Sequence, residues 1–421
     1  KCSALASTTY SRPFGIFRFG EPMNLLTSSN PLLNQFLPEL IDLRRHLHAH
    51  PELSGQEHQT AALVAGELRK YGWRVKEAVG RTGVIAELGP SNGAVVGFRI
   101  DMDALPVEER TGLDYASLHQ GLMHACGHDL HTCIGLGVAR LLAAEQSSLE
   151  TGVRLLFQPA EEIAEGARWM RKDGATDQLN ALFGVHVFPE LPVGTVGVRS
   201  GALTAAAGEL EILIIGEGGH GAKPHQSIDA IWIASKIVSG LQESISRGLD
   251  ALQPVVISFG KIEGGKAFNV IADRVRLLGT VRCLDNSLHE TLPAWITDTV
   301  QSIAQSFGGK ANVNYRCITP IVYNDPELTR LLESCAVSLL GEENVVRLDR
   351  PSLGAEDFAE LLRDVPGTMF RLGVAGANGC APLHNGQFSL DERSLVVGIE
   401  VITETLFRWM KKHSNKGEVL S

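Results

Sequence analysis

Apolar positions along the first half of the chain recur at two spacings, one typical of helices and the other of strands. The helical spacing occurs at residues 34–49, 57–71 and 130–144, and the strand-like runs at 73–79, 83–88, 94–100, 153–157 and 182–187. An amphipathic helix buries one stripe and a strand buries one or both faces, so each element needs a partner layer. The alternation of the two patterns predicts a layered α/β domain.

The order of elements changes after Gly201. Strand, helix, strand, strand, helix and strand follow one another, at residues 209–215, 227–246, 255–262, 270–283, 288–307 and 311–318. This is the β-α-β-β-α-β order of ferredoxin-like domains. We therefore predict a separate α+β domain at residues 201–318.

The C-terminal part of the chain holds too few elements for a core of its own. Helices at residues 326–340 and 389–412 flank a single strand at 369–374. We therefore expect residues 319–421 to rejoin residues 33–200 in one domain, into which the α+β domain is inserted.

Composition and charge exclude several classes of protein. The chain carries a formal net charge of −10 without a basic block, so nucleic acid, which needs clustered Lys and Arg, is not an expected partner. No apolar run approaches the roughly 20 residues that cross a bilayer, so we expect no contact with a membrane. The seven cysteines are scattered and odd in number, which indicates a reduced, cytoplasmic protein. Residues 1–32 are expected to be a disordered tail, with a cleavable transit peptide as the alternative.

The densest group of reactive side chains lies at residues 123–132, which hold three histidines, a cysteine and an aspartate. Cys126 and His128 stand two residues apart, just before a predicted helix. A loop there can aim a thiolate and an imidazole at one point, and both are good ligands for zinc and similar ions. The alternative is a cluster that only caps the helix. A structural zinc finger is disfavoured, because no second Cys/His pair follows at the required spacing.

Two adjacent carboxylates, Glu161 and Glu162, follow the predicted strand at 153–157. Side chains of neighbouring residues diverge, so one glutamate can bind a metal while the other contacts an activated water as general base. The alternative is an exposed pair that opens a helix, where the helix dipole favours negative charge.

Other polar residues stand at the ends of predicted strands. His186 lies near the end of an apolar strand, where it could share a sheet edge with Glu162 or simply be a core histidine. Asp101 and Asp103 fall on one face of an extended segment and could orient metal ligands, or they could belong to an Asp-rich turn. His384 is isolated and carries no pattern of its own.

Five stretches of the chain resemble, in order, the M20 metallopeptidase family. They are residues 44–54, 99–106, 123–132, 158–162 and 383–384. The resemblance is to the amidohydrolase branch, which contains aminoacylases, hippurate hydrolases and auxin-conjugate hydrolases, and it covers about residues 36 to 411. It implies a zinc-exopeptidase-like α/β catalytic domain with a mixed sheet between helices, and an inserted α+β ferredoxin-like domain that acts as a lid.

The resemblance also implies roles for particular residues. Two divalent metal ions, with zinc or manganese expected and cobalt or nickel as alternatives, would be bound by Cys126, His128, Glu162, His186 and His384. Glu161 matches the general base that activates the water. Asp103 matches an aspartate that orients the site from behind the metals.

Further matches fall in or near the predicted lid. Residues 218–225 resemble the family's GGHxAxPH segment, in which a histidine stabilises the developing oxyanion; His220 is the better match and His225 the second candidate. The alternative is a Gly-rich turn whose histidines only satisfy backbone groups. Asn269 matches a residue that helps to hold the substrate carboxylate. Glu356 is a candidate substrate contact, although Ala355 departs from the family's GGEDF pattern.

The predicted activity is metal-dependent hydrolysis of the amide bond in an N-acyl amino acid or a related small conjugate. The resemblance implies a homodimer that forms through the lid. A carboxypeptidase or dipeptidase is the nearest alternative, and an inactive metal-binding scaffold is the alternative from another class. We assign no metal to His46, His48 or His50, and we expect His124 and His131 to be structural or to support the ligands.

Overall fold

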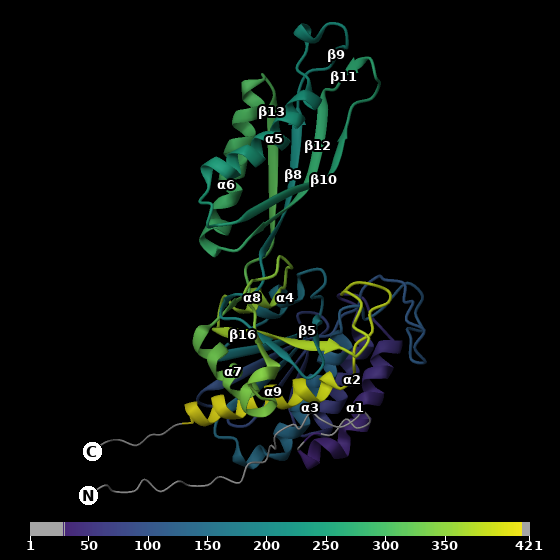
Figure 1. Ribbon diagram of the computed structural model, residues 1–421, viewed down its shortest axis with the longest axis vertical. Helices are drawn as coiled ribbons and strands as arrows, with labels where there is room; N and C mark the ends of the chain where they lie inside the picture. The colour runs from purple at the N-terminus through teal and green to yellow at the C-terminus, as the bar shows by residue number, and fades with distance from the viewer. Residues whose placement is uncertain (1–27, 29, 415–421) are drawn as a thin grey trace, which may run out of the picture. The chain divides into compact units, whose positions relative to one another are not determined.

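The computed structural model of this chain describes residues 28 and 30–414, which form two compact units (Figure 1). Unit 1 comprises the described residues up to Ser200, Asp325–Leu348, and the described residues from Asp364 onward; unit 2 comprises Gly201–Asn324 and Asp349–Arg363. Residues 349–363, which the sequence analysis places in the catalytic domain, thus group with unit 2. The predicted tail at 1–32 lies outside the described residues, apart from its last few positions.

Unit 1 is built on a mixed eight-stranded sheet in the order β1-β2-β4-β3-β5-β16-β6-β15. Its strands are β1 (Arg74–Val79), β2 (Gly83–Leu88), β3 (Val95–Asp101), β4 (Gly152–Gln158), β5 (Ala181–Pro192), β6 (Val196–Val198), β15 (Val345–Arg347) and β16 (Gly367–Ala375). The central β4-β3-β5-β16 strands are parallel, whereas β1, β2 and the β6–β16 pair are antiparallel. The predicted mixed sheet is confirmed.

Helices of unit 1 pack against this sheet or, in the case of α1, against another helix. They are α1 (Pro31–Ala49), α2 (His58–Lys70), α3 (His128–Ala144), α4 (Gly166–Lys172), α7 (Pro326–Leu340) and α9 (Ser394–His413), with short 3₁₀ turns η1 (Gln146–Ser148) and η3 (Glu342–Asn344). α3 is buried along almost its whole length, because α1 and α9 lie against it on the same side of the sheet (Figure 1). Gly135 permits the close approach of α3 to the sheet, since a Cβ there would lie 2.8 Å from Cγ1 of Ile100 in β3.

The start of α1 shows how a local signal fixes a helix end. The Asn30 side chain accepts hydrogen bonds from the backbone of Leu32 and Leu33, and Pro31 occupies the first helical turn. An asparagine cap is favourable because its side chain satisfies backbone N–H groups that the helix leaves unpaired. Proline in the first turn is favourable because it lacks an N–H that would be unpaired in any case. The helix therefore begins a few residues earlier than the apolar spacing alone indicates.

Unit 2 holds a four-stranded antiparallel sheet in the order β10-β12-β8-β13. Its main elements, in chain order, are β8 (Ala206–Ile215), α5 (Ala230–Gly248), β10 (Val255–Gly264), β12 (Arg274–Cys283), α6 (Asn286–Ser306) and β13 (Lys310–Thr319). Its short elements are β7 (Gly201–Ala202), β9 (Gly219–His220), η2 (Pro224–Gln226), β11 (Val270–Ile271), β14 (Tyr323–Asn324) and α8 (Phe358–Leu361). The observed element order and sheet order are those of a ferredoxin-like domain.

The alternation of side chains along β8 explains how this sheet is covered. Leu210, Ile212 and Ile214 are buried, while Glu209 and Glu211 point the other way and pair with arginines of neighbouring strands. α5 and α6 lie on the same face of the sheet (Figure 1). One face is therefore packed by helices and the other is polar, as is common in antiparallel sheets.

Two details of unit 2 differ from the apolar pattern. The predicted strand at 270–283 is divided into β11 and β12, because the carbonyls of Ala272 and Asp273 accept hydrogen bonds from Ala230 and Gly216 instead of joining the ladder. The segment 349–363 joins unit 2 through backbone bonds, from Ser352 N to Leu203 O and from Ala205 N to Gly354 O. Among the described residues, no helix is both long and apolar enough to cross a membrane.

Candidate metal centre

The predicted metal ligands of unit 1 meet at the carboxyl ends of its central parallel strands. β3 ends at Asp101, β4 ends just before Glu161, and β5 carries His186. The carboxyl ends of parallel strands lie at one edge of the sheet, where loops can combine side chains from distant parts of the sequence. The structure thus brings together residues separated by many positions in the chain.

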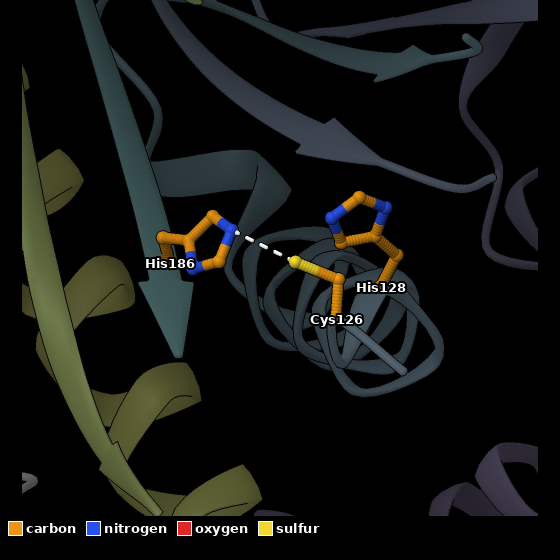
Figure 2. A group of neighbouring side chains, drawn as sticks. All are labelled: Cys126, His128 and His186. Carbon is orange, nitrogen blue, oxygen red and sulfur yellow. Dashed lines mark hydrogen bonds between the residues drawn. The ribbon is translucent and has the colours of Figure 1, made fainter. Parts of the chain in front are cut away.

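A left-handed glycine directs Cys126 and His128 to one place. Gly127 has φ of 77° and stands at the N-terminus of α3. A Cβ at this glycine would lie 2.8 Å from Cγ2 of Val187, so the position also permits close packing against β5. Sγ of Cys126 lies 3.5 Å from Nε2 of His186, with His128 beside it (Figure 2). The potential ligand atoms of these three buried residues all lie within 4.8 Å of one another.

Cys126 belongs to a second group as well, formed with Glu162 and His384, whose potential ligand atoms also lie within 4.8 Å of one another. Nε2 of His384 is 3.4 Å from Oε2 of Glu162. His384 has φ of 61°, and its backbone N–H donates to the carbonyl of Ala125 over 2.8 Å. Left-handed backbone is uncommon for histidine, and such conformations concentrate at functional sites.

Unpartnered buried atoms test whether metal ions fit these groups. Among the described residues, Nε2 of His128 and Oε1 of Glu162 are buried without a hydrogen-bond partner, and they lie 3.9 Å apart. Buried polar atoms in folded proteins are nearly always satisfied. Burial also raises the pKa of Glu162 to about 7, and the charge of the nearby His128 opposes this only in part. Thiolate, imidazole and carboxylate are suitable ligands for divalent metals, so the residues fit two such ions that share Cys126.

Asp103 holds two of these side chains in place. Its Oδ1 lies 3.2 Å from Nδ1 of His128, and its Oδ2 accepts hydrogen bonds from the backbone of Glu162 over 3.0 Å and from Oγ of Ser54 over 2.6 Å. Burial favours protonation of Asp103, but the hydrogen bond with His128 outweighs it, and the pKa of Asp103 is lowered. An imidazole bound through Nδ1 presents Nε2 to a metal, which is how supporting carboxylates orient metal ligands.

Glu161 lies at the same place as Glu162, although neighbouring side chains were expected to diverge. Oxygen atoms of both glutamates lie within 4.8 Å of a ring nitrogen of His128. No regular helix begins here; α4 starts only at Gly166. Ala160, with φ of 53°, donates its N–H to Oε1 of Glu57 over 2.8 Å. This turn lets two successive carboxylates approach one point.

Two further residues, His131 and Glu57, support the site, and the sequence indicated such a role only for His131. Nδ1 of His131 contacts Oδ1 of Asp101 over 2.5 Å, and Nε2 of His131 accepts from the backbone N–H of Val187 over 3.0 Å. This contact fixes the backbone next to His186. Glu57 is fully buried and anchors Ala160, yet nothing in its local sequence distinguishes it from an exposed glutamate that precedes a helix.

His48 of α1 is held by carboxylates that lie outside the groups of potential metal ligands. Nδ1 of His48 lies 2.8 Å from Asp129, whose carboxylate also pairs with Arg44 over 2.9 Å. Within the described part of the chain, His46, His48, His50 and His124 belong to none of the groups of potential metal ligands. His131, in contrast, groups with Asp101 and His128 behind the predicted ligands.

The remaining predicted site residues belong to unit 2. His220 in β9 is exposed, pairs with Val270 of β11, and accepts through Nδ1 from the backbone of Ala222 over 3.1 Å. Asn269 and His225 are also exposed, and the carbonyl of Asn269 accepts from Gly221 over 2.9 Å. Glu356 is buried and accepts from the backbone of Phe358 over 3.1 Å. Their roles toward the metal centre stay predictions.

Residues 97–408 match the sequence model of peptidase family M20/M25/M40. The chain belongs to this family. Membership of this family, together with the mixed sheet, identifies a metal-dependent amidohydrolase, as the resemblance implied. The group of buried side chains described above is the candidate site for its divalent metal ions.

Proteins similar to this chain carry names that indicate different substrates. N-acetyl-L-cysteine deacetylase of Bacillus subtilis is 39% identical over 377 residues, which cover 89% of this chain and 89% of the relative. IAA-amino acid hydrolase ILR1-like 2 of Arabidopsis thaliana is 35% identical over 391 residues, covering 91% of this chain and 88% of that protein. A solved dinuclear metal binding peptidase of the M20 family from Bacillus subtilis is 36% identical with a TM-score of 0.79, covering 90% of this chain and 99% of its own.

Proposed function

We propose that this protein uses two divalent metal ions to hydrolyse the amide bond of an N-acyl amino acid or a related small conjugate. The observation that carries the proposal is the position of Cys126 in both groups of ligand atoms, with the carboxylate of Glu161 beside them. The N-acetyl-L-cysteine deacetylase and the IAA-amino acid hydrolase among the relatives both act, by their names, on such small amides.

The proposed ligands divide between two positions. Cys126, His128 and His186 would hold one ion, and Cys126, Glu162 and His384 the other. When bound, divalent ions supply the Lewis acidity that activates a water and polarises the amide carbonyl. The thiolate and imidazoles favour zinc, and manganese, cobalt and nickel are the alternatives to test.

Glu161 is the proposed general base. Its carboxylate takes the proton of the attacking water and then delivers that proton to the leaving amine. Asp103 acts as a positioning residue, since it holds both the ring of His128 and the backbone of Glu162. The role of Asp103 requires no large movement within unit 1, because its contacts with His128 and Glu162 are already made.

Unit 2 is the proposed lid. His220, or His225 in its place, would stabilise the oxyanion, and Asn269 would bind the substrate carboxylate. Support comes from the exposure of all three side chains and from the β9–β11 pairing, which joins the chain at His220 to the chain beside Asn269. Glu356 is retained as a candidate substrate contact.

Unit 2 is also the proposed dimerisation surface. Large apolar side chains are exposed on it, including Ile231, Trp232 and Ile262. β10 and β13 are edge strands of its sheet, and unpaired edges can pair with a second copy. We further propose a cytoplasmic location, which is supported by the absence of disulfides among the six described cysteines.

A substrate panel tests the function. N-acetyl, N-benzoyl and indole-acyl amino acids, together with dipeptides, are incubated with enzyme before and after chelation and with zinc, manganese or cobalt restored. We expect chelator-sensitive cleavage of acyl amino acids. Cleavage of dipeptides alone would indicate a peptidase instead, and metal binding without any turnover would indicate a scaffold.

A further inference from the structure

Unit 2 contains a thiol–imidazole pair that plays no part in the proposed reaction. Cys317 lies near the end of β13, an edge strand, opposite Gly208 of β8. The register of the β13–β8 pair shifts between Cys317 and Thr319. Such irregularities change the direction of side chains at a sheet edge. Cys317 is half-buried, so small molecules can reach it without unfolding of the sheet.

The imidazole comes from the first turns of α6. Nε2 of His289 lies 2.9 Å from Sγ of Cys317. His289 is only 7% exposed, and its Nδ1 has no hydrogen-bond partner among the described residues. With Nε2 accepting the thiol proton, the ring carries its own proton on Nδ1, where it remains available as a donor. Burial lowers the pKa of His289, so at neutral pH the ring is an unprotonated base.

Tyr315 supplies a second unpartnered polar group beside this pair. Its ring lies 6.5 Å from that of His289, centroid to centroid, and its hydroxyl is buried without a partner among the described residues. Gly208 creates the space, because a Cβ at this position would collide with the hydroxyl of Tyr315. Two potential donors and a thiol therefore lie close together at this end of the sheet, a combination suited to a small polar oxidant.

We propose that Cys317 is a reactive thiol that small peroxides oxidise to a sulfenic acid, with His289 as the base. The thiol proton moves to Nε2 of His289, and the sulfur attacks one peroxide oxygen. The S–O bond forms as the O–O bond breaks, and His289 returns the proton to the leaving oxygen. Sulfur is oxidised by two electrons, and the peroxide is reduced to water, or to an alcohol if it is an alkyl hydroperoxide.

The other described cysteines supply internal comparisons. Cys380 is also half-buried, but its Sγ donates to the carbonyl of Ser389 over 3.2 Å, and a carbonyl cannot accept a proton as a base does. Cys283 lies in the same sheet as Cys317 but is buried, and its Sγ faces the carbonyl of Asp285. Exposure alone therefore predicts equal reactivity of Cys317 and Cys380, whereas our proposal predicts that Cys317 reacts faster.

The test measures sulfenic acid formation at each cysteine of the metal-loaded enzyme. The full chain is treated with limiting hydrogen peroxide in the presence of a dimedone-type probe, and peptide mass spectrometry gives the rate at each site. We expect labelling of Cys317 at least about tenfold faster than that of Cys380, because the thiol of Cys317 has an imidazole within reach of its proton and that of Cys380 has only a carbonyl. Equal rates would overturn the proposal.

A variant separates the effect of the imidazole from that of exposure. His289→Gln keeps a polar side chain of similar reach but removes the base, and the Cys317 rate should fall about tenfold while that of Cys380 is unchanged. Labelling of Cys283 reports loosening of unit 2 in the variant. If Cys283 stays protected and the Cys317 rate does not fall, the proposal is wrong; if Cys283 becomes labelled, the wild-type comparison with Cys380 decides alone.

Discussion

The metal centre of unit 1 and the histidines at the β9–β11 end of unit 2 differ in how their surroundings hold them. In unit 1, His128 is buried and fixed by Asp103, and His186 lies in β5, whose backbone N–H at the next residue, Val187, donates to His131. In unit 2, His220 is exposed, and its ring accepts only a local hydrogen bond from Ala222. If the proposed function is right, the side chains of unit 1 already hold the positions that ion binding requires, whereas the histidines of unit 2 would be oriented only by substrate or by a neighbouring surface.

The largest effect on activity should come from replacing Glu161, the proposed base in unit 1. Glu161→Gln keeps the shape of the side chain but cannot take a proton, so we expect kcat to fall by about 10²- to 10⁴-fold with metal content retained. Steady-state kinetics and metal analysis of the same sample measure both quantities. Glu165→Gln, four residues further and outside the ligand groups, is the matched control. Wild-type kcat in the Glu161 variant would remove it from the mechanism.

Replacing the exposed histidines of unit 2 should lower activity and leave metal binding unchanged. His220→Ala is expected to lower kcat by about 10²- to 10³-fold, as loss of one oxyanion donor does, without changing metal content or the melting temperature. His225→Ala should have a smaller effect. The reverse order of the two variants would assign the oxyanion role to His225, and two silent variants would show that neither exposed histidine takes part.

Replacing Asp103, which contacts two of the proposed metal ligands, should reduce metal affinity. Asn in place of Asp103 cannot accept from both His128 and Glu162, so affinity should fall by about 10- to 100-fold. Competition with a chromogenic chelator measures it. Ser54→Ala removes only one donor to Asp103 and should therefore cost much less. Similar losses in the two variants would mean that Asp103 does not orient the ligands.

The smallest expected effect concerns His48 and stability. Burial favours the neutral ring, but hydrogen bonds with Asp129 and Glu109 outweigh it and raise the pKa of His48, although nearby Arg44 opposes this. The stabilisation is therefore complete below the model-peptide value of 6.5 and is lost as pH rises through the higher folded-state value. His48→Asn should lower the free energy of unfolding by about 1–3 kcal/mol at acidic pH and by less at alkaline pH. A difference that does not vary with pH in urea titrations would contradict this.

Local signals predicted much of the fold. The bounds of α7, Pro326–Leu340, agree with the expected helix because Asp325 caps its start and Gly341 follows its end. β6 and β15 were missed, because strands of three residues are too short to show a period. The grouping of residues 349–363 with unit 2 depends on backbone bonds to distant residues, for which the sequence carries no periodic signal.

The residues of the candidate site likewise differ in how far local sequence signals predicted them. Cys126, His128 and the two glutamates stand in dense local motifs, and the structure brings them together. His384 was identified only through the family resemblance, since its approach to Glu162 depends on a left-handed residue in an irregular loop. More than two hundred residues separate Glu162 from His384, and the spacing of residues in the sequence predicts contacts only between positions that are close in the chain.

The division of unit 2 between two chain segments has a consequence for synthesis of the protein. Thr204 and Ser352 form a bridge, and Arg282 donates to the carbonyl of Leu353, so unit 2 is complete only after residue 363 has left the ribosome. Unit 1 waits still longer, because β16 and α9 are needed to complete its sheet and core. Contacts between such distant residues slow folding and leave strand edges exposed in the growing chain. Nascent chains that end before β16 should therefore be especially dependent on chaperones.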